Sequence, residues 1–185
     1  MAKHQSKPLS LDPVWDRIRS DAKASIAAEP LIGGMVHATI LHHDTLESAL
    51  AYRFAMKLAS GEMSEQLLRE IADEAYANDP SLGEAARADL TAVYERDPAC
   101  HSVLQPLLFF KGFQAVQAYR IGHWLWAAKR RDLAYFIQAR VSEILVQRAW
   151  ELLCLLPLGG VGSNMGRREA SCLGSELLVS GHVTG

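Results

Sequence analysis

The feature that most constrains the fold is a series of apolar residues spaced three or four positions apart, the period of an α-helix. These stripes lie at Val14, Ile18, Ala22 and Ile26; at Leu46, Leu50, Phe54 and Leu58; at Leu67, Leu68, Ile71 and Ala75; at Leu82, Ala86, Leu90 and Val93; and at Ala134, Ile137, Val141 and Ile144. Before Val146 no run alternates apolar and polar residues between turns, as a half-buried strand would. The pattern therefore predicts an all-α, multi-helix domain over residues 12–145.

Turn and capping residues predict where these helices begin and end. Three Asp-Pro pairs can each place Asp at an N-cap and Pro at the first helical position, so we interpret them as helix starts. They are Asp12-Pro13, Asp79-Pro80 and Asp97-Pro98, and the last also marks the end of the preceding helix. The expected N-caps of three further helices are Asp44, Ser64 and Asp132.

Two more helices are expected between these boundaries. A short helix is predicted over residues 31–42, before the stripe that starts at Leu46. A longer one, over residues 111–129, should be the most buried helix of the domain because its sequence is strongly apolar. On one side of it we expect Phe113, Val116, Arg120, His123 and Trp124 close together.

The two ends of the chain differ from this helical region. Residues 1–11 contain basic residues but no apolar segment after them, so we interpret them as a flexible arm and not as a secretory signal. Residues 146–185 are rich in Gly and Ser and lack an apolar period, which predicts a mostly disordered tail. Within it, the run LGGVGSNMG at 158–166 misses the dinucleotide-binding fingerprint, because its third glycine is at 166 and not at 165. We interpret that run as a linker.

Charge and cysteine content limit the partners and the compartment. A formal net charge of -2 provides no basic surplus for phosphates, which argues against a nucleic-acid partner. The apolar stretch at 144–158 is interrupted by Arg148 and Glu151 and is too short to span a membrane. The 3 cysteines lie far apart, as is typical of reduced thiols in a cytoplasmic protein.

Neither a metal site nor a catalytic motif is expected. His37 and His42 are five positions apart and point to different helix faces, unlike a helical zinc pair. We expect His37 to be partly buried and hydrogen-bonded to the backbone, with His42 and His43 solvated near a helix end. Cys100 is more easily a small core residue than a nucleophile.

Two other conspicuous groups have structural explanations. The aromatic residues of the 109–126 stretch lie at helical spacing, which favours core and subunit interface over a cofactor site. They are Phe109, Phe110, Phe113, Tyr119, Trp124 and Trp126. The basic run 129–131 is expected to be a solvated helix end, where cations complement the helix dipole. Asp97, read from the residues alone, is an N-cap of a turn before Pro98.

Four ordered motifs resemble the N-terminal helical domain of bacterial serine O-acetyltransferases. They are HATILHHDTLESALAYRFAMKLAS, DEAYANDP, RDPAC and LLFFKGFQAVQAYRIGHWLW, and the similarity extends over about residues 14–145. The resemblance implies transfer of acetyl from acetyl-CoA to the hydroxyl of L-serine, which gives O-acetylserine for cysteine synthesis. It also implies a homo-oligomer, commonly a dimer of trimers, assembled through the helical domain. A left-handed β-helix of hexapeptide repeats supplies most of the active site in the family.

The resemblance assigns one possible site residue in this chain. The resemblance implies that the aspartate of the family's Arg-Asp-Pro motif contacts the serine substrate at its ammonium group. Asp97 of Arg96-Asp97-Pro98 is the matching residue, and its role depends on a β-helix being present.

After about residue 145 the family's hexapeptide repeats and catalytic histidine are not found, so no catalytic residue is assigned and acetyl-CoA is expected as a family co-substrate that this chain does not bind. O-acetylserine sulfhydrylase is not an expected partner, because the family's terminal isoleucine tail has no counterpart at Gly185. The abrupt change of sequence suggests a frameshifted or truncated gene. Two interpretations stay open: a serine O-acetyltransferase by descent, or a non-catalytic oligomerisation module that could enter assemblies as an inactive subunit.

Overall fold

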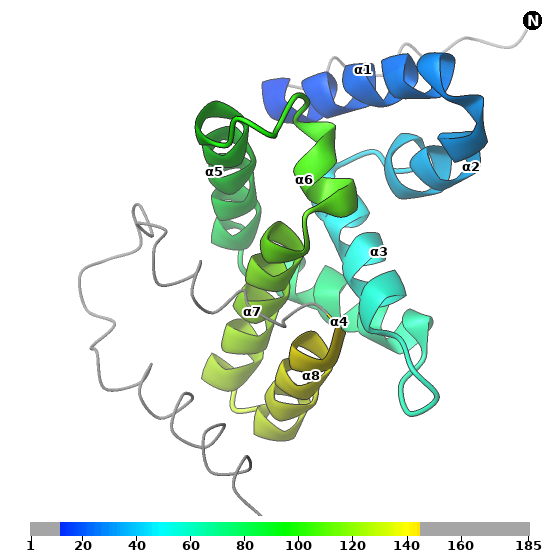
Figure 1. Ribbon diagram of the computed structural model, residues 1–185. Coiled ribbons are helices and arrows are strands. Elements are labelled where there is room, and N and C mark those ends of the chain that lie inside the picture. The colour runs from blue at the N-terminus through cyan, green and yellow to red at the C-terminus, as the bar shows by residue number, and fades with distance from the viewer. Residues whose placement is uncertain (1–11, 145–185) are drawn as a thin grey trace, which may run out of the picture. The chain divides into compact units, whose positions relative to one another are not determined.

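The computed structural model describes residues 12–144, and these residues form helices joined by short connections, with no strand among them (Figure 1). The α-helices are α1 (Pro13–Ala28), α2 (Gly33–Val36), α3 (Leu46–Leu58), α4 (Glu65–Asn78), α5 (Ser81–Arg96), α6 (Leu104–Phe109), α7 (Lys111–Ala127) and α8 (Arg131–Ile144). The predicted all-α class is confirmed for this part of the chain. The expected arm at 1–11, the tail at 146–185 and its glycine-rich run lie outside the described residues.

Local capping explains several helix starts as predicted. Asp12 accepts a hydrogen bond from Trp15 N at 3.0 Å, with Pro13 at the first helical position of α1. Ser64 caps α4 by accepting from Leu67 N at 3.3 Å. The N-cap of α5 is Pro80 and not the predicted Asp79, although the Asp79 side chain accepts from Ser81 N at 3.1 Å. Each side-chain oxygen satisfies an amide that has no partner inside its helix.

The predicted caps at Asp44 and Asp132 are also wrong. The N-cap of α3 is Thr45 and not Asp44, because the Thr45 hydroxyl accepts from Ser48 N at 3.2 Å. At α8 the helix begins at Arg131, so Asp132 lies inside the first turn. The chain enters α8 through Lys129, whose φ of 63° is left-handed, and Arg130 N donates to Leu125 O at 2.9 Å. The helix has therefore started before Asp132 is reached.

The predicted short helix over 31–42 is present but composite. A 3₁₀ turn at Pro30–Ile32 leads into α2, and a π-helical turn at His37–Leu41 follows it. A π turn inserts one residue into the helical period, so the faces of later residues shift by about 100°. This shift decides which histidine is buried, as described below.

The core lies between α3 and the helices around it. Eight of the 13 residues of α3 are buried, against eight of the 17 of α7, so the expectation that α7 is the most buried helix is wrong. The reason lies in the last turns of α7, where His123, Trp126 and Ala127 are exposed. Of the group expected together on α7, Phe113 and Val116 are buried and His123 is exposed. Leu67 is likewise 52% exposed, unlike Leu68 and Ile71 beside it.

An arginine clamp joins three helices. Arg87 on α5 donates to Asp12 Oδ2 at 2.6 Å and to Glu47 Oε1 at 2.6 Å, which ties the start of α1 and the first turn of α3 to α5. Gly83 makes room for it, since a Cβ there would lie 2.3 Å from Glu47 Oε1. Burial alone would raise the pKa of the Asp12 carboxyl, but hydrogen bonds from Arg87 and Trp15 outweigh burial and lower the pKa.

Over residues 12–144 no helix is long and apolar enough to cross a membrane.

Candidate functional site

Asp97 stands where α5 ends. Its Oδ1 accepts from Ala99 N at 2.9 Å, and its carbonyl accepts from Cys100 N at 2.9 Å, so residues 97–100 form a capped turn. The interpretation of Asp97 as the cap of a turn and the end of α5 is confirmed, but it starts no helix, because α6 begins only at Leu104. Arg96, Pro98 and Ala99 are exposed around it. The turn therefore presents a carboxylate at the surface with one oxygen already fixed by the backbone.

The connection that follows this turn is anchored to α1. Ser102 Oγ donates to Asp21 Oδ2 at 2.5 Å and accepts from Leu104 N at 3.1 Å. His101 N donates to Gln105 Oε1 at 2.8 Å. These side-chain bonds fix the turn that precedes α6, whose N-cap is Val103.

A second tie holds the last turns of α5 against α1. Arg17 Nη2 donates to the Tyr94 hydroxyl at 2.7 Å, and the same guanidinium lies 4.3 Å from the centre of the Tyr94 ring. The Asp97 turn is thus fixed on both sides, through Tyr94 before it and Ser102 after it. The sequence offered no signal for this pair, since Arg17 and Tyr94 are 77 positions apart.

Cys100 closes the turn from the inside. It is 7% exposed, and its thiol donates to Ser102 O at 3.4 Å. Burial raises the pKa of the thiol, which disfavours the thiolate that a nucleophile needs. The interpretation of Cys100 as a small buried residue is confirmed.

The structure confirms the exposed position of His42 but reverses the expectations for His37 and His43. His43 is buried at 6% exposure, whereas His37 and His42 are exposed. The π turn before it rotates His43 inward, where its Nδ1 lies 3.0 Å from Ser48 Oγ and its Nε2 has no hydrogen-bond partner. The Ser48 hydroxyl also accepts from Arg69 Nη2 at 2.8 Å.

Burial and the nearby Arg69 lower the pKa of His43, so the ring is held neutral. The Ser48 hydroxyl accepts from Arg69 Nη2 and lies within hydrogen-bond distance of His43 Nδ1, so it bridges the two side chains. Ser48 and His43 are thus a closed pair inside the fold and not an open nucleophile with its base. The described helices bring no group of three or more His, Cys, Asp or Glu side chains close enough to hold a metal ion.

The aromatic and basic groups divide between core and surface. Phe113 is buried and Trp124 is partly buried against the core, in line with the structural interpretation, but Phe109 and Trp126 are 54% and 40% exposed. The basic run 129–131 is only partly solvated. Arg130 pairs with Glu74 at 2.6 Å, and Arg131 lies 5.2 Å from the centre of the Trp126 ring.

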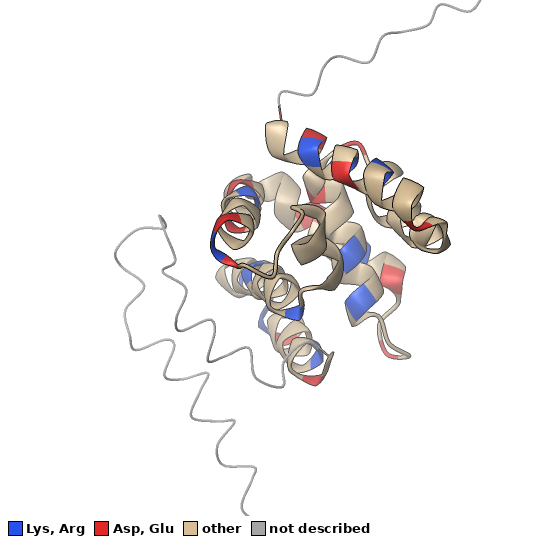
Figure 2. Cartoon of the chain, turned by 45° about the horizontal axis from the view of Figure 1, so that its top comes forward, with Lys and Arg blue, Asp and Glu red and all other residues tan. Residues whose placement is uncertain are grey.

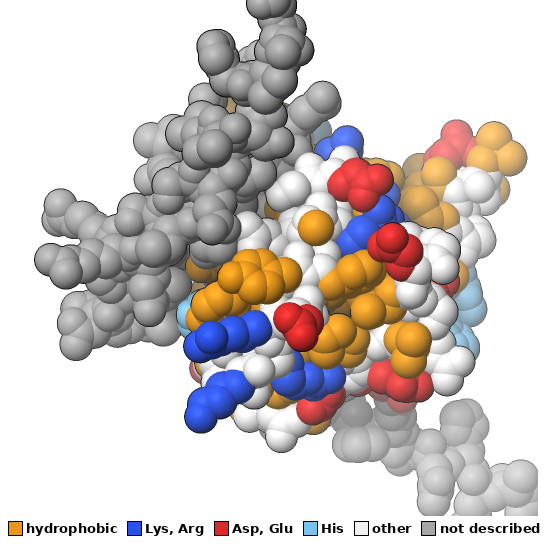
Figure 3. Space-filling view, turned by 90° about the horizontal axis from the view of Figure 1, so that it is seen from below, with side chains coloured by type: hydrophobic (Ala, Val, Ile, Leu, Met, Phe, Trp, Pro, Cys, Tyr) orange, Lys and Arg blue, Asp and Glu red, His pale blue; other side chains and the backbone are white. Residues whose placement is uncertain are grey.

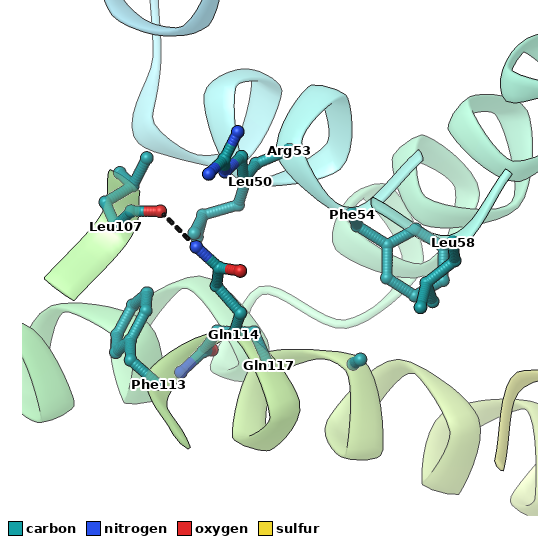
Figure 4. A pocket seen from close by; sticks show the side chains of 9 residues that line it. Leu50, Arg53, Phe54, Leu58, Leu107, Phe113, Gln114 and Gln117 are labelled. Carbon is teal, nitrogen blue, oxygen red and sulfur yellow. Dashed lines mark hydrogen bonds between the residues drawn. The ribbon is translucent and has the colours of Figure 1, made fainter. Parts of the chain in front are cut away.

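A small hollow lies between α3, α6 and α7 (Figure 4). Its volume of about 20 Å³ has room for roughly one water molecule, too little for an amino acid or an acetyl group. Among its lining residues, Gln114 Nε2 donates to Leu107 O at 3.0 Å and to Leu108 O at 3.1 Å. The hollow is therefore a packing feature of the corner between α6 and α7 and not a substrate pocket.

Comparisons with known proteins agree on one family. The sequence profile described as "Serine acetyltransferase, N-terminal" matches residues 14–118. The serine acetyltransferase of Salmonella typhimurium is 49% identical over 132 residues, which are 71% of this chain and 48% of that protein. The crystal structure of Neisseria gonorrhoeae serine acetyltransferase superposes with a TM-score of 0.71 at 45% identity, covering 72% of this chain and 54% of that one.

A second structure of the Neisseria gonorrhoeae enzyme, in complex with serine, gives a TM-score of 0.70 at 44% identity and covers 76% of this chain and 58% of that one. The chain belongs to the serine acetyltransferase family, which it matches through the N-terminal helical domain. It spans about half the length of the curated bacterial relatives. The resemblance inferred from the four sequence motifs is confirmed.

Proposed function

We propose that this chain supplies the helical assembly domain of a serine O-acetyltransferase, with Asp97 as a contact for the serine substrate. The enzyme's reaction moves the acetyl group of acetyl-CoA to the hydroxyl of L-serine. The family membership supports the reaction class, and the Asp97 turn supports the contact. The single observation that carries the proposal is the Arg-Asp-Pro turn, fixed on both sides at the surface of a domain that matches the family.

The geometry at Asp97 suits an ammonium ligand. Oδ1 is committed to Ala99 N, while no hydrogen bond is described for Oδ2 within residues 12–144. A carboxylate oxygen that is held in place but still has free lone pairs can form a short, charge-assisted hydrogen bond with an amino acid's ammonium. Because the turn is already fixed, little conformational freedom would be lost on binding.

The proposal assigns the chemical step to residues outside the described helices. Deprotonating the serine hydroxyl needs a positioned base, which contributes about 10²- to 10⁴-fold. Of the described histidines, His43 is enclosed in the core, and His101, the nearest to Asp97 in sequence, is exposed on the connection to α6. The helical domain by itself is therefore expected to be inactive, and the base and the acetyl-CoA groove to belong to a β-helix of the family type.

Assembly is the second part of the proposal. The end of the molecule where α7 runs into α8 carries hydrophobic side chains beside basic ones (Figure 3). Trp126 and Tyr135 meet edge to face at 5.4 Å and are 40% and 51% exposed, with Arg131 over the Trp126 ring. Trp, Tyr and Arg are the residues most enriched at protein interfaces. We assign this patch, Trp126, Arg131 and Tyr135, to contacts between copies in a homo-oligomer, as in the family's dimer of trimers, formed in the cytoplasm.

A non-catalytic oligomerisation module is the second candidate, because the match to the family lies in its assembling half. Two measurements on the purified 185-residue chain separate the readings. Release of CoA from acetyl-CoA and L-serine, followed with a thiol reagent, reports catalysis, and light scattering after size exclusion reports assembly. We expect an oligomer without turnover. Measurable turnover would exclude the module, and a strict monomer would contradict the assembly role.

A further inference from the structure

A π-helical turn brings two histidines to the same side of the chain. The turn runs over His37–Leu41, and its hydrogen bond from His42 N to His37 O, 2.9 Å long, joins the two histidines directly. In an α-helix, residues five positions apart lie about 140° apart around the axis, and on that spacing the two rings were expected on different faces. A π turn closes its hydrogen bond after five residues instead of four, so it brings positions i and i+5 together. The expectation of different faces is therefore wrong.

The two rings are close enough to share a ligand. Their centroids lie 6.5 Å apart, with 43° between the ring planes. A metal ion bound to imidazole nitrogens at about 2.0–2.1 Å places the centroids of two ligating rings roughly 5 Å apart. Both side chains are exposed, so side-chain rotation can close the difference without movement of the backbone. Within residues 12–144 the ring nitrogens of this pair form no hydrogen bond that would have to break first.

A third histidine supports one of the two rings. His43 is 6% exposed, and its Nδ1 lies 3.0 Å from Ser48 Oγ. Its ring meets that of His42 edge to face, with centroids 5.6 Å apart and 80° between the planes. This contact limits the orientations of the His42 ring, so less conformational freedom is lost when a ligand binds. His43 is not itself available as a ligand, because Ser48 engages its Nδ1 and its Nε2 is enclosed.

The surroundings of the pair decide which kind of ion it can hold. Residues 30–43 contain no Lys, Arg, Asp or Glu, so the ribbon of this segment is tan in Figure 2. Asp44 follows, but it completes no group of three possible metal ligands with the two histidines. Arg19 of α1 reaches the segment, and its guanidinium donates to His43 O at 2.5 Å. Neutral imidazoles suit Zn²⁺, Ni²⁺ and Cu²⁺, whereas Mg²⁺ and Ca²⁺ require oxygen ligands that the pair does not offer.

We propose that His37 and His42 form a two-ligand binding site for a divalent transition-metal ion of the Ni²⁺ or Zn²⁺ class, with water completing its coordination. The pair is the π-helical equivalent of the i, i+4 histidines that bind zinc from one face of an α-helix. A bound ion bridges the first residue of the π turn and the residue that caps it, and so holds the turn closed. The site is independent of the proposed acetyl transfer, since neither histidine belongs to the Asp97 turn.

The test is calorimetric titration of the whole 185-residue chain with NiCl₂. Ni²⁺ is the probe because thiolates select Zn²⁺ more strongly, so the 3 cysteines of the chain interfere less. We expect saturable binding of one ion to the pair. His37→Gln and His42→Gln should each weaken it about tenfold or more, since a single imidazole remains. His123→Gln is the matched control: it removes an exposed histidine from α7 and should leave the affinity unchanged.

The pattern of loss separates a shared ion from two independent histidines. If both rings hold one ion, each substitution lowers the affinity. If each histidine bound its own ion, each substitution would lower the number of bound ions and leave the affinity of the rest unchanged, which overturns the proposal. Ni²⁺ should also raise the unfolding midpoint of the wild type more than that of either variant, because the ion binds the folded pair.

Circular dichroism checks that the variants keep their helices, as expected for substitutions at the exposed positions His37 and His42. Absence of saturable binding, wild-type affinity in both variants, or an equal loss in His123→Gln also overturns the proposal.

Discussion

Ser102 Oγ donates to Asp21 Oδ2 over 2.5 Å, joining two residues that are 81 positions apart in the chain. The bond fastens the connection between α5 and α6 to α1, and Asp97 lies five residues before it on the same connection. The Arg17–Tyr94 contact fastens the other side. The position of the Asp97 carboxylate is therefore set by long-range contacts, although its local conformation is set by its own turn.

Ser102→Ala should destabilise the domain by about 1–2 kcal/mol, because it leaves the part-buried Asp21 carboxylate and the Leu104 amide without a partner. Urea unfolding followed by circular dichroism measures the change. Ser20→Ala, an exposed serine on the same helix as Asp21, is the control and should stay within about 0.5 kcal/mol. Equal effects of the two substitutions would show that the Asp21 bond adds nothing to stability.

Arg87→Met should cost about 1–3 kcal/mol at neutral pH, since it removes the guanidinium from which Asp12 and Glu47 both accept at the junction of α1, α3 and α5. Arg130→Met removes a more exposed pair with Glu74 and should cost less than about 1 kcal/mol. Chemical unfolding of both variants gives the comparison. A larger loss for Arg130→Met would contradict the clamp.

The Arg87 clamp also has a pH signature. Burial would raise the pKa of Asp12, but hydrogen bonds from Arg87 and Trp15 outweigh it and lower the pKa in the folded state. A lowered carboxyl pKa stabilises the fold above the unfolded value of about 3.9, and this contribution disappears as the pH falls through the folded value. Unfolding measured below about pH 4 should therefore show a shallower acid loss in Arg87→Met than in the wild type.

His43 should make the domain less stable in mild acid. Burial and Arg69 lower its folded pKa, so the unfolded chain binds the proton more readily. Stability is then expected to fall as the pH drops below about 6.5, by at most about 1.4 kcal/mol per pH unit, until the folded value is reached. His43→Gln, which does not titrate, should flatten the pH dependence of the unfolding midpoint. His37→Gln, at an exposed position, should retain it.

Helix caps could be predicted from the sequence where neighbouring residues alone determine them. Asp12 and Ser64 cap their helices as expected because a cap depends on amides two or three positions away. The prediction of Asp44 as an N-cap was wrong because the neighbouring Thr45 can cap as well, and packing of Trp15, whose Nε1 donates to Asp44 O, selects the register.

Burial and tertiary contacts were beyond local reasoning. His43 was expected in solvent, but the π turn at His37–Leu41 changes the helical phase just before it. At the candidate site, Asp97 and its turn could be read from the sequence, whereas Asp21 and Arg17 reach it from α1 across some eighty positions. The buried Arg53 likewise had no signal, because its place on α3 became interior only through packing of α6 and α7.

Trp126→Lys should weaken self-association without unfolding the domain. Trp126 is 40% exposed and contacts Tyr135, so its substitution removes interface area from the patch and adds a charge where copies are proposed to meet. Sedimentation velocity should show smaller species with unchanged helical circular dichroism. Leu31→Lys changes a residue that is 92% exposed away from the patch and should leave the assembly intact. If only Leu31→Lys dissociated the oligomer, the interface would lie near Leu31, and the assignment to the Trp126 patch would be wrong.

Asp97 can be tested where a catalytic half is supplied. A chimera in which residues 1–144 replace the corresponding helical domain of the Salmonella typhimurium enzyme should release CoA in the presence of L-serine. Asp97→Asn in the chimera should raise KM for serine about tenfold or more, because a charge-assisted bond to the ammonium is worth about 1.5–3 kcal/mol. KM for acetyl-CoA should change little, and Glu95→Gln, an exposed acidic residue on the last turn of α5, should leave both constants unchanged. Equal rises in the two KM values would indicate that Asp97 acts through the fold of its turn and does not contact serine.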